Sequence, residues 1–222
     1  MTLEELIRRF RVNVNDKALP YLFEDLDVTD WLNEAQEQAC IRARLLRDDA
    51  TVAVTQIPLT VGTHTYALHE SVYELISVRL IHASGDDPTP LPIQSREWLD
   101  KNIPDWRESE EEAFCIVQDD TKIRVVGTFV ADDRIDLECY RLPLEALAND
   151  ADEPEIHRAN HIHLIDWAMH KGFSIPDMEV FDPDRANKAE ARFTRHFGPL
   201  PDADMRRITR HDVEHANTSI LP

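Results

Sequence analysis

Residues 27–47 read DVTDWLNEAQEQACIRARLLR, and this stretch decides the fold class. Its apolar side chains return at steps of three and four, as in an amphipathic helix: Val28, Leu32, Ala35, Ala39, Ala43 and Leu46. Because the middle of this stripe is alanine, a neighbouring helix can approach closely there. We expect Asp27 to cap the helix and Asp48-Asp49 to end it. Trp31 and Ile41 lie off the stripe, which indicates a second contacted surface; this surface and the β region are the two candidates for contact between subunits.

Helical patterns also occur at both ends of the chain. Thr2 and Glu5 have the spacing of a capping box, followed by an apolar stripe. Residues 156–173 carry apolar side chains over a wide face, which predicts a largely buried helix. A last helix is bracketed by Asp182-Pro183 and Gly198. Each of these helices has an apolar side that must be covered, and we expect the helices to cover one another.

The middle of the chain has the alternating pattern of β-strands. We expect strands at 52–57, 65–68, 76–81, 114–118, 121–126 and 134–142. Asp119-Asp120 predicts a tight hairpin between two of them. A short helical turn is expected from Ser95 to Leu99.

These patterns predict an α+β fold. A helical bundle formed by the N- and C-terminal helices carries an inserted antiparallel β region and is followed by an extended C-terminal arm. The expected domains are a discontinuous helical domain of residues 1–50 and 150–198, a β insertion of residues 51–149, and an arm of residues 199–222.

Composition narrows the functional classes. The 222 residues include 43 acidic and 24 basic side chains, for a formal net charge of −19. Such a chain does not bind nucleic acid or anionic lipid through its net field. No apolar run approaches ~20 residues, so we expect no membrane span. The N-terminus lacks the pattern of a signal peptide, and the three scattered cysteines indicate reduced thiols in a cytosolic product.

The residues give little support to catalysis or to metal binding. His157, His161, His163 and His170 fall in one expected helix, and the first two are four residues apart. A zinc protease motif would need a glutamate after the first histidine, where Arg158 stands. The paired aspartates lie at expected turns, and only 5 glycines are present, so no glycine-rich phosphate loop is formed. We therefore expect no catalytic, cofactor-binding or metal-ligating residues.

The C-terminal segment reverses the charge of the chain. Its basic part contains Met205, Arg206, Arg207, Ile208, Arg210 and His211. The segment has no helical or strand period and contains proline, so it would order only against another surface. We interpret it as a partner-docking arm.

Several stretches, in their order and spacing, carry a family resemblance: Asp30 to Arg44, Gly62, Tyr66-Ala67-Leu68, Leu99-Asp100, Pro104 to Arg107, Pro154-Glu155-Ile156, His161, Leu164, Asp166-Trp167-Ala168, and Asp182-Pro183 with Phe193 and Phe197-Gly198. Over residues 1–198 the chain resembles the head-to-tail adaptor, or connector, proteins of tailed bacteriophages.

The resemblance implies a structural virion protein that is not an enzyme. Such adaptors form a homo-oligomeric ring, commonly dodecameric, that docks on the portal protein and presents a surface to a downstream tail or nozzle protein. They continue the channel for packaging and ejection of double-stranded DNA, which passes without specific binding. The arm would then be a portal-docking arm. The expected location is the head–tail interface of the virion, with synthesis in the host cell cytoplasm and no membrane partner.

Two other readings stay open at this point. One is a metal-dependent hydrolase that uses His157 and His161. The other is a monomeric acidic module that mimics DNA and binds a DNA-handling enzyme. The negative charge is compatible with a DNA conduit, since carboxylates repel phosphate whereas Lys and Arg would hold it.

Overall fold

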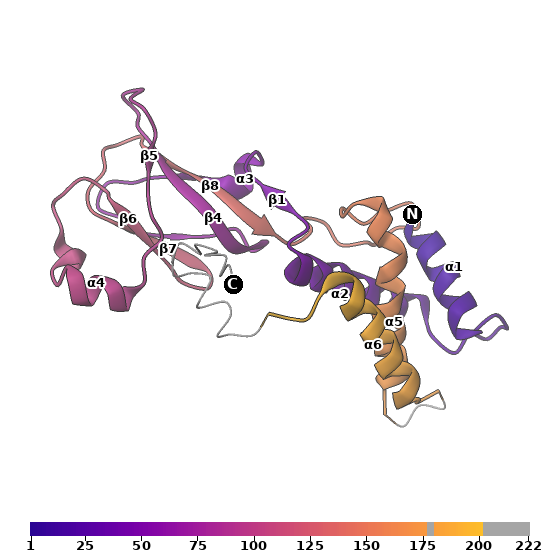
Figure 1. The fold of residues 1–222 in the computed structure, drawn as a ribbon. Coiled ribbons are helices and arrows are strands. Elements are labelled where there is room, and N and C mark those ends of the chain that lie inside the picture. Colours follow the sequence, from indigo (N-terminus) through magenta and orange to yellow (C-terminus); the bar gives the residue numbers. More distant parts are fainter. Residues whose placement is uncertain (177–179, 202–222) are drawn as a thin grey trace, which may run out of the picture. The chain divides into compact units, whose positions relative to one another are not determined.

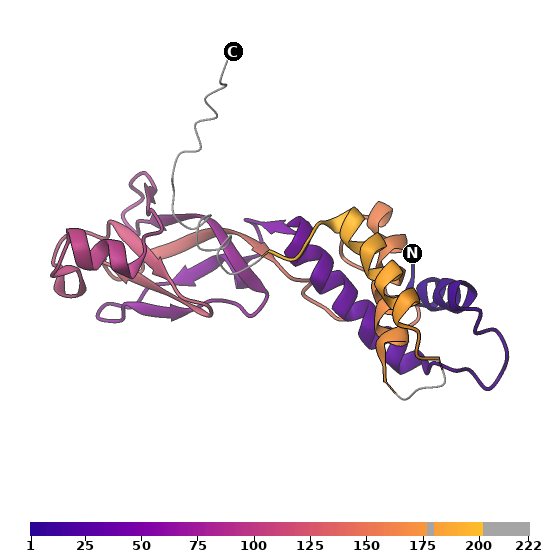
Figure 2. The same ribbon diagram turned by 60° about the horizontal axis from the view of Figure 1, so that its bottom comes forward.

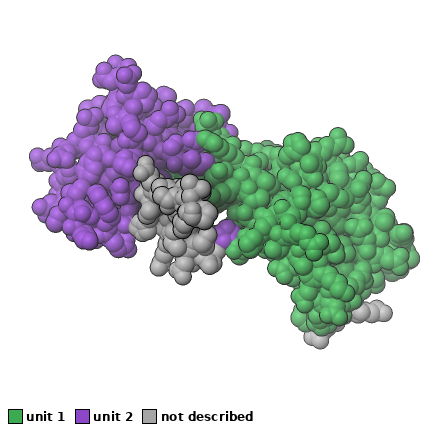
Figure 3. Space-filling model, in the orientation of Figure 1, with its two compact units in different colours: residues 1–49, 70–75, 139–200 green, residues 50–69, 76–138, 201–222 purple. Residues whose placement is uncertain are grey.

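The computed structural model describes residues 1–176 and 180–201. The chain divides into two compact units, shown in separate colours in Figure 3. The helical unit comprises residues 1–49, 70–75 and 139–200, and the β unit comprises mainly residues 50–69 and 76–138. The predicted α+β class is confirmed, because helices from both ends of the chain share one core and the sheets between them are antiparallel.

Four helices build the helical unit: α1 (Leu3–Val14), α2 (Asp25–Ala43), α5 (His161–Ser174) and α6 (Pro183–Phe197). Helix α5 contacts the other three and lies between α1 and α6 (Figure 1). Helices α2 and α6 meet near their C-terminal ends, where Arg42 Nη1 donates to Thr194 Oγ1 at 3.0 Å (Figure 2). A short 3-10 helix, η2 (Arg158–Asn160), precedes α5.

The helix ends follow the capping signals of the sequence. Thr2 and Glu5 form the predicted capping box, and Asn15 closes α1 with a φ of 64°. Asp182 accepts a hydrogen bond from the backbone N–H of Arg185 at 3.0 Å, and Pro183 occupies the first turn of α6. Both predictions for these ends are confirmed.

One hydrophobic core joins the four helices. Its fully buried members include Leu6, Phe10, Leu32, Ala35, Ala39, Leu164, Ala168, Ala189 and Phe193. Ala35 and Ala39, in the middle of the α2 stripe, are fully buried, which lets α5 pack closely against this helix. Burying side chains of this size is the main source of stability for such a bundle.

The strands form two antiparallel sheets. One has the order β1-β8-β4-β5, with β2 also paired to β8: β1 (Arg47–Asp48), β2 (Gln56–Pro58), β4 (Val72–Ile81), β5 (Thr89–Pro90) and β8 (Arg134–Arg141). The other has the order β3-β7-β6: β3 (Thr65–Ala67), β6 (Cys115–Gln118) and β7 (Lys122–Val126). The predicted hairpin is confirmed, since Val117 pairs with Arg124 and Asp119 N–H donates to Lys122 O at 2.8 Å.

The β unit has a small core of its own beside β6 and β7. Helix α4 (Arg96–Asn102) and the 3-10 helix η1 (Trp106–Glu108) contribute Leu99 and Trp106 to it. The indole N–H of Trp106 donates to Asp100 Oδ1 at 2.9 Å, so its polar atom is satisfied.

The strand predicted for residues 52–57 is wrong in its first part. Residues Val52–Thr55 form a short helix, α3, and only Gln56–Pro58 form β2. The carbonyl of Thr51 accepts the N–H groups of Val54 and Thr55, both at 2.9 Å, and the Thr55 hydroxyl at 3.0 Å. These local bonds outweigh the strand preference of the β-branched side chains.

Two helix boundaries also differ from the prediction. Helix α2 begins at Asp25 with Glu24 as its N-cap, and it ends at Ala43 because Arg44 turns into the left-handed region with a φ of 50°. Asp27 therefore lies inside the first turn, and Asp48 belongs to β1. Helix α5 begins at His161, so His157 lies before it and caps η2 instead.

All three cysteines are buried and free of disulfides. Burial raises the pKa of Cys40 to about 12 and the pKa values of Cys115 and Cys139 to about 11. Among the helices of the described residues, none combines the length and the apolar composition that crossing a bilayer requires.

Candidate interaction surfaces

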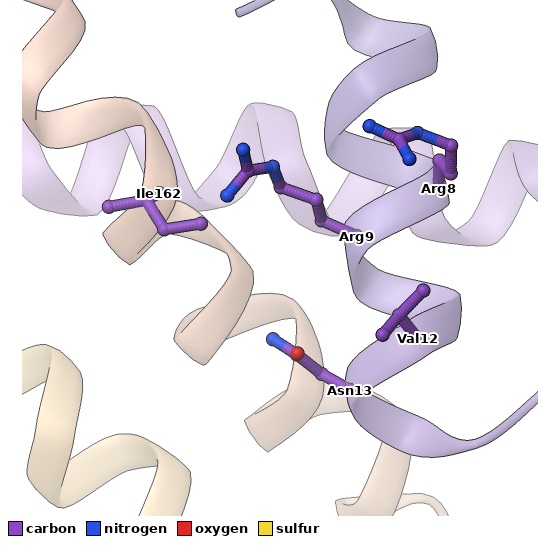
Figure 4. A pocket seen from close by; sticks show the side chains of 5 residues that line it. All are labelled: Arg8, Arg9, Val12, Asn13 and Ile162. Carbon is purple, nitrogen blue, oxygen red and sulfur yellow. The ribbon is translucent and has the colours of Figure 1, made fainter.

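A shallow groove of about 280 Å³ lies between α1 and α5 (Figure 4). It is lined by Arg8, Arg9, Val12 and Asn13 of α1 and by Ile162 of α5. Figure 4 shows Arg9 and Asn13 extending from α1 toward Ile162. The groove is open and combines cations with apolar rims, which suits a polypeptide carrying carboxylates better than an enclosed small molecule.

The two arginines of this groove have no ion-pair partner within residues 1–176 and 180–201. Arg8 and Arg9 are exposed on a chain whose net charge is −19. An acidic segment of a partner protein therefore gains favourable electrostatic interaction energy at these unpaired cations.

The loop between α1 and α2 is fixed by a buried ion pair. Arg11 Nη1 donates to Asp16 Oδ2 at 2.8 Å, and both side chains are at most 9% exposed. Arg11 Nη2 donates to Phe23 O at 3.1 Å, while Asp16 accepts the backbone N–H groups of Leu22 and Phe23. The guanidinium also lies 3.6 Å from the centre of the Tyr21 ring. The loop is therefore held in one shape although most of it faces solvent.

This fixed loop presents apolar side chains outward. Leu19 is 77% exposed and Leu22 is 49% exposed, and Leu26, in the first turn of α2, is 76% exposed. Exposed leucines on a rigid base are typical of a protein contact surface, because their burial by a partner costs little conformational entropy.

Trp31 is already packed inside the chain. Its ring lies 6.2 Å from that of Phe10 and 5.7 Å from that of Phe23, and Gly172 leaves room for it on α5. Ile41 is partly exposed on α2. The role of Trp31 and Ile41 in subunit contact stays a prediction. Of the two, Ile41 is more available for such a contact, because Trp31 already packs against Phe10 and Phe23.

A second buried arginine ties the end of β8 to its surroundings in the helical unit. Arg141 Nε donates to Asp48 Oδ2 at 2.6 Å, and its two terminal nitrogens donate to Glu155, one of them at 3.0 Å. Hydrogen bonds from Arg141 hold the pKa of Glu155 below its usual value of 4.5. This cluster fixes the loop before α5, so it is structural.

The structure does not place the four histidines in a metal-binding arrangement. His161 is buried and its Nε2 donates to Ile156 O at 2.8 Å, while its Nδ1 lies 2.9 Å from the Met1 amine. His157 Nδ1 accepts the N–H of Ala159, and His170 Nδ1 donates to Ala186 O. His163 stacks on His196 with ring centres 3.6 Å apart. In the described part of the chain, no three His, Cys, Asp or Glu side chains lie together as a metal site would require.

The remaining predicted site residues lie outside the described residues: Met205, Arg206, Arg207, Ile208, Arg210 and His211. Conversely, the Arg11–Asp16 loop and the Arg8–Arg9 groove were missed by sequence reasoning. The signal available in the sequence was the apolar run of residues 19–23, which precedes the acidic start of the next helix.

Comparison with models of known protein families matches residues 1–216 to the family described as SU10 adaptor protein. No curated protein matches the chain. The match covers the helical unit, the β unit and most of the C-terminal segment.

Proposed function

This chain belongs to the SU10 adaptor protein family, a family of phage head-to-tail adaptors, and from that premise we propose that it forms a ring between the portal and the tail. The family makes the chain a structural component of the virion that interacts with portal and tail proteins. The finer proposal is a homo-oligomeric ring, dodecameric as in similar adaptors, which docks on the portal and joins capsid to tail.

We further propose that this ring continues the DNA channel and performs no catalysis. The net charge of −19 supports the first point, because a wall rich in carboxylates repels phosphate and lets DNA slide. The C-terminal arm, residues 199–222, would reach the portal through its basic stretch. The observation that carries the proposal is the family match over residues 1–216.

The test is binding to the portal. The purified chain is mixed with portal rings and analysed by size-exclusion chromatography with light scattering. We expect a complex of defined stoichiometry, and we expect particles made without this protein to fail to join head and tail. A chain that never binds the portal, or particles that remain infectious without it, would refute the proposal.

The portal-binding test, repeated with a variant in which His157 and His161 are replaced, separates the proposed ring from the DNA-mimic module and the hydrolase. A DNA-mimic module stays monomeric and has no portal affinity. A hydrolase that depends on His157 and His161 loses function when both are replaced, whereas an adaptor ring keeps portal binding as long as the fold survives. The engagement of His161 in two hydrogen bonds gives the hydrolase reading no geometric support.

A further inference from the structure

One side of α2 carries a row of carboxylates at steps of three and four residues: Asp27, Asp30, Glu34 and Glu37. Side chains at these spacings lie above one another on a single face of a helix. Asp27, Asp30 and Glu37 are exposed, and Ile41 continues the row by one more step of four. We call this row the acidic stripe.

One side of α6 carries a row of cations at the same steps: Arg185, Lys188, Arg192 and Arg195. All four are exposed. Phe181, four residues before Arg185 and just ahead of the helix N-cap, is 48% exposed. We call this row the basic stripe.

Most of these charges have no partner of opposite sign in residues 1–176 and 180–201. Among the described residues, Asp27, Asp30, Glu37, Lys188 and Arg195 have no ion pair and no side-chain hydrogen bond. Burial and the neighbouring Glu34 raise the pKa of Glu37, so the acidic stripe is electrostatically unfavourable in a single copy.

The two stripes lie on different sides of the helical unit. Lys171 of α5 pairs with Glu34 at 3.0 Å, and Asp166 of α5 pairs with Arg192 at 2.7 Å. Asp166 and Lys171 are five residues apart, which separates them by about 140° around the axis of α5. The stripes therefore border α5 on separate sides, as the two halves of a head-to-tail contact must.

The stripes match in antiparallel register. Steps of three, four, three and four lead from Asp27 to Ile41, and the same steps lead backwards from Arg195 to Phe181. The register gives the pairs Asp27–Arg195, Asp30–Arg192, Glu34–Lys188, Glu37–Arg185 and Ile41–Phe181. At ~1.5 Å per residue the charged part of each row is about 15 Å long. Four pairs of opposite charge then coincide, and the apolar residues Ile41 and Phe181 follow at the same end of the two rows, Phe181 just before the start of α6.

We propose that the acidic stripe on α2 of one copy docks against the basic stripe on α6 of its neighbour in the ring. The inference rests on the proposed ring and adds the contact that closes it. Copies that each carry a charge of −19 repel one another at long range, so they need a local attraction that also fixes orientation. Antiparallel rows of opposite charge with an apolar end supply both.

The test uses two reversed variants and their mixture. The first variant is Arg185→Glu with Arg195→Glu, and the second is Asp27→Lys with Glu37→Lys. Each one alone meets like charges at its own contact, so we expect loss of at least about tenfold in assembly on portal rings. An equimolar mixture restores opposite charges at every contact of an even-numbered ring, and we expect it to assemble as the original chain does.

Two control variants carry the same change of net charge in the β unit. They are Lys101→Glu with Lys122→Glu and Asp87→Lys with Glu108→Lys, all at exposed positions. Both should assemble normally. Circular dichroism and thermal unfolding of every variant confirm that the fold is kept. Phe181→Ser tests the apolar end and should weaken assembly by about tenfold.

The outcomes separate this inference from the proposed function. Normal assembly of either reversed variant alone, or failure of the folded variants to recover when mixed, overturns the stripe contact and leaves the ring in place. Equal loss in the charge-matched controls also overturns it. If the original chain forms no complex with portal rings at all, the proposed function itself fails.

Discussion

The loss of Arg141 should destabilise the fold strongly. Its side chain is buried between Asp48, which is also buried, and Glu155. Arg141→Met keeps the apolar stem but leaves both carboxylates without this cation, so we expect a loss of ~3–5 kcal/mol in the free energy of unfolding. Urea unfolding measures it.

Arg134→Met is the matched control for that experiment. Arg134 lies on the same strand and pairs with Asp136, but its side chain is 46% exposed. Its replacement should leave the unfolding midpoint almost unchanged. Equal effects of the two substitutions would show that the buried cluster is not special.

The lowered pKa of Glu155 predicts how the stability of the fold depends on pH. Hydrogen bonds from Arg141 and from the Leu144 N–H lower its pKa in the folded chain below the ordinary 4.5. A lowered pKa contributes stability that is present above the unfolded value and is lost as the pH falls through the folded value. Stability should therefore decrease as the pH drops below about 5. Glu155→Gln should make that decrease smaller, which urea titrations across pH can measure; an unchanged slope would contradict the assignment.

At the scale of elements, Gly127 controls the close approach of β7 to the segment before β6. Its φ is +105°, and an added Cβ would lie 2.8 Å from Ala113 Cα and from the carbonyl oxygens of Glu111 and Glu112. Gly127→Ala should destabilise the β unit by ~2 kcal/mol or more through strain and overlap. Urea unfolding gives the value.

Gly85 separates the two causes of that effect. Its φ is +85°, but an added Cβ would meet nothing within 4 Å. Gly85→Ala therefore reports the conformational cost alone, ~1–2 kcal/mol. If both substitutions cost the same, steric overlap at Gly127 plays no part.

The elements that the sequence predicted well are those with strong local signals. Helix α6 has a cap, a proline, an apolar stripe and a terminal glycine that all agree, and the hairpin of β6 and β7 has alternating residues around Asp119-Asp120. Helix α3 was missed because the segment rich in β-branched residues is bent by hydrogen bonds to Thr51 O, which no periodicity reveals. The start of α2 was misplaced because the sequence alone does not favour Asp25 over Asp27 as the first residue of the helix. Asp25 pairs with Arg11, and this pairing is visible only in the fold.

The interaction surfaces were less predictable for a related reason. A stripe of apolar residues predicts a core, but the exposed loop between α1 and α2 depends on the pairing of Arg11 in α1 with Asp16 in the loop. The four histidines were predicted to lie in one helix because that helix was expected to start at residue 156. Helix α5 begins at His161, four residues after His157, so His157 lies outside it. Pairings between elements need the fold itself.

In the assembly of whole molecules, repulsion between net charges opposes attraction at the local contacts. The dependence of assembly on salt concentration should reveal both effects. The Debye length is about 30 Å at 0.01 M salt, about 8 Å at 0.15 M and about 3 Å at 1 M. The first increase screens the repulsion between copies of charge −19 while contacts at ion-pair distance persist; the second weakens those contacts too.

We therefore expect assembly on portal rings to rise and then fall with salt. Light scattering across this range measures it, and the isolated chain should remain monomeric at the lowest salt. Stable rings of the chain alone at 0.01 M would contradict the balance described here. A monotonic fall would show that attraction dominates at every distance.

The buried cysteines have a practical consequence. Cys40, Cys115 and Cys139 are at most 1% exposed and are the only cysteines in the chain, and their raised pKa values keep them protonated at neutral pH. Maleimide reagents should therefore not react with these three thiols in the native protein. A single thiol introduced by Lys101→Cys, at an exposed position of the β unit outside the proposed contact, then carries a fluorophore without any background removal, and neighbouring dyes report each subunit joining its ring in real time.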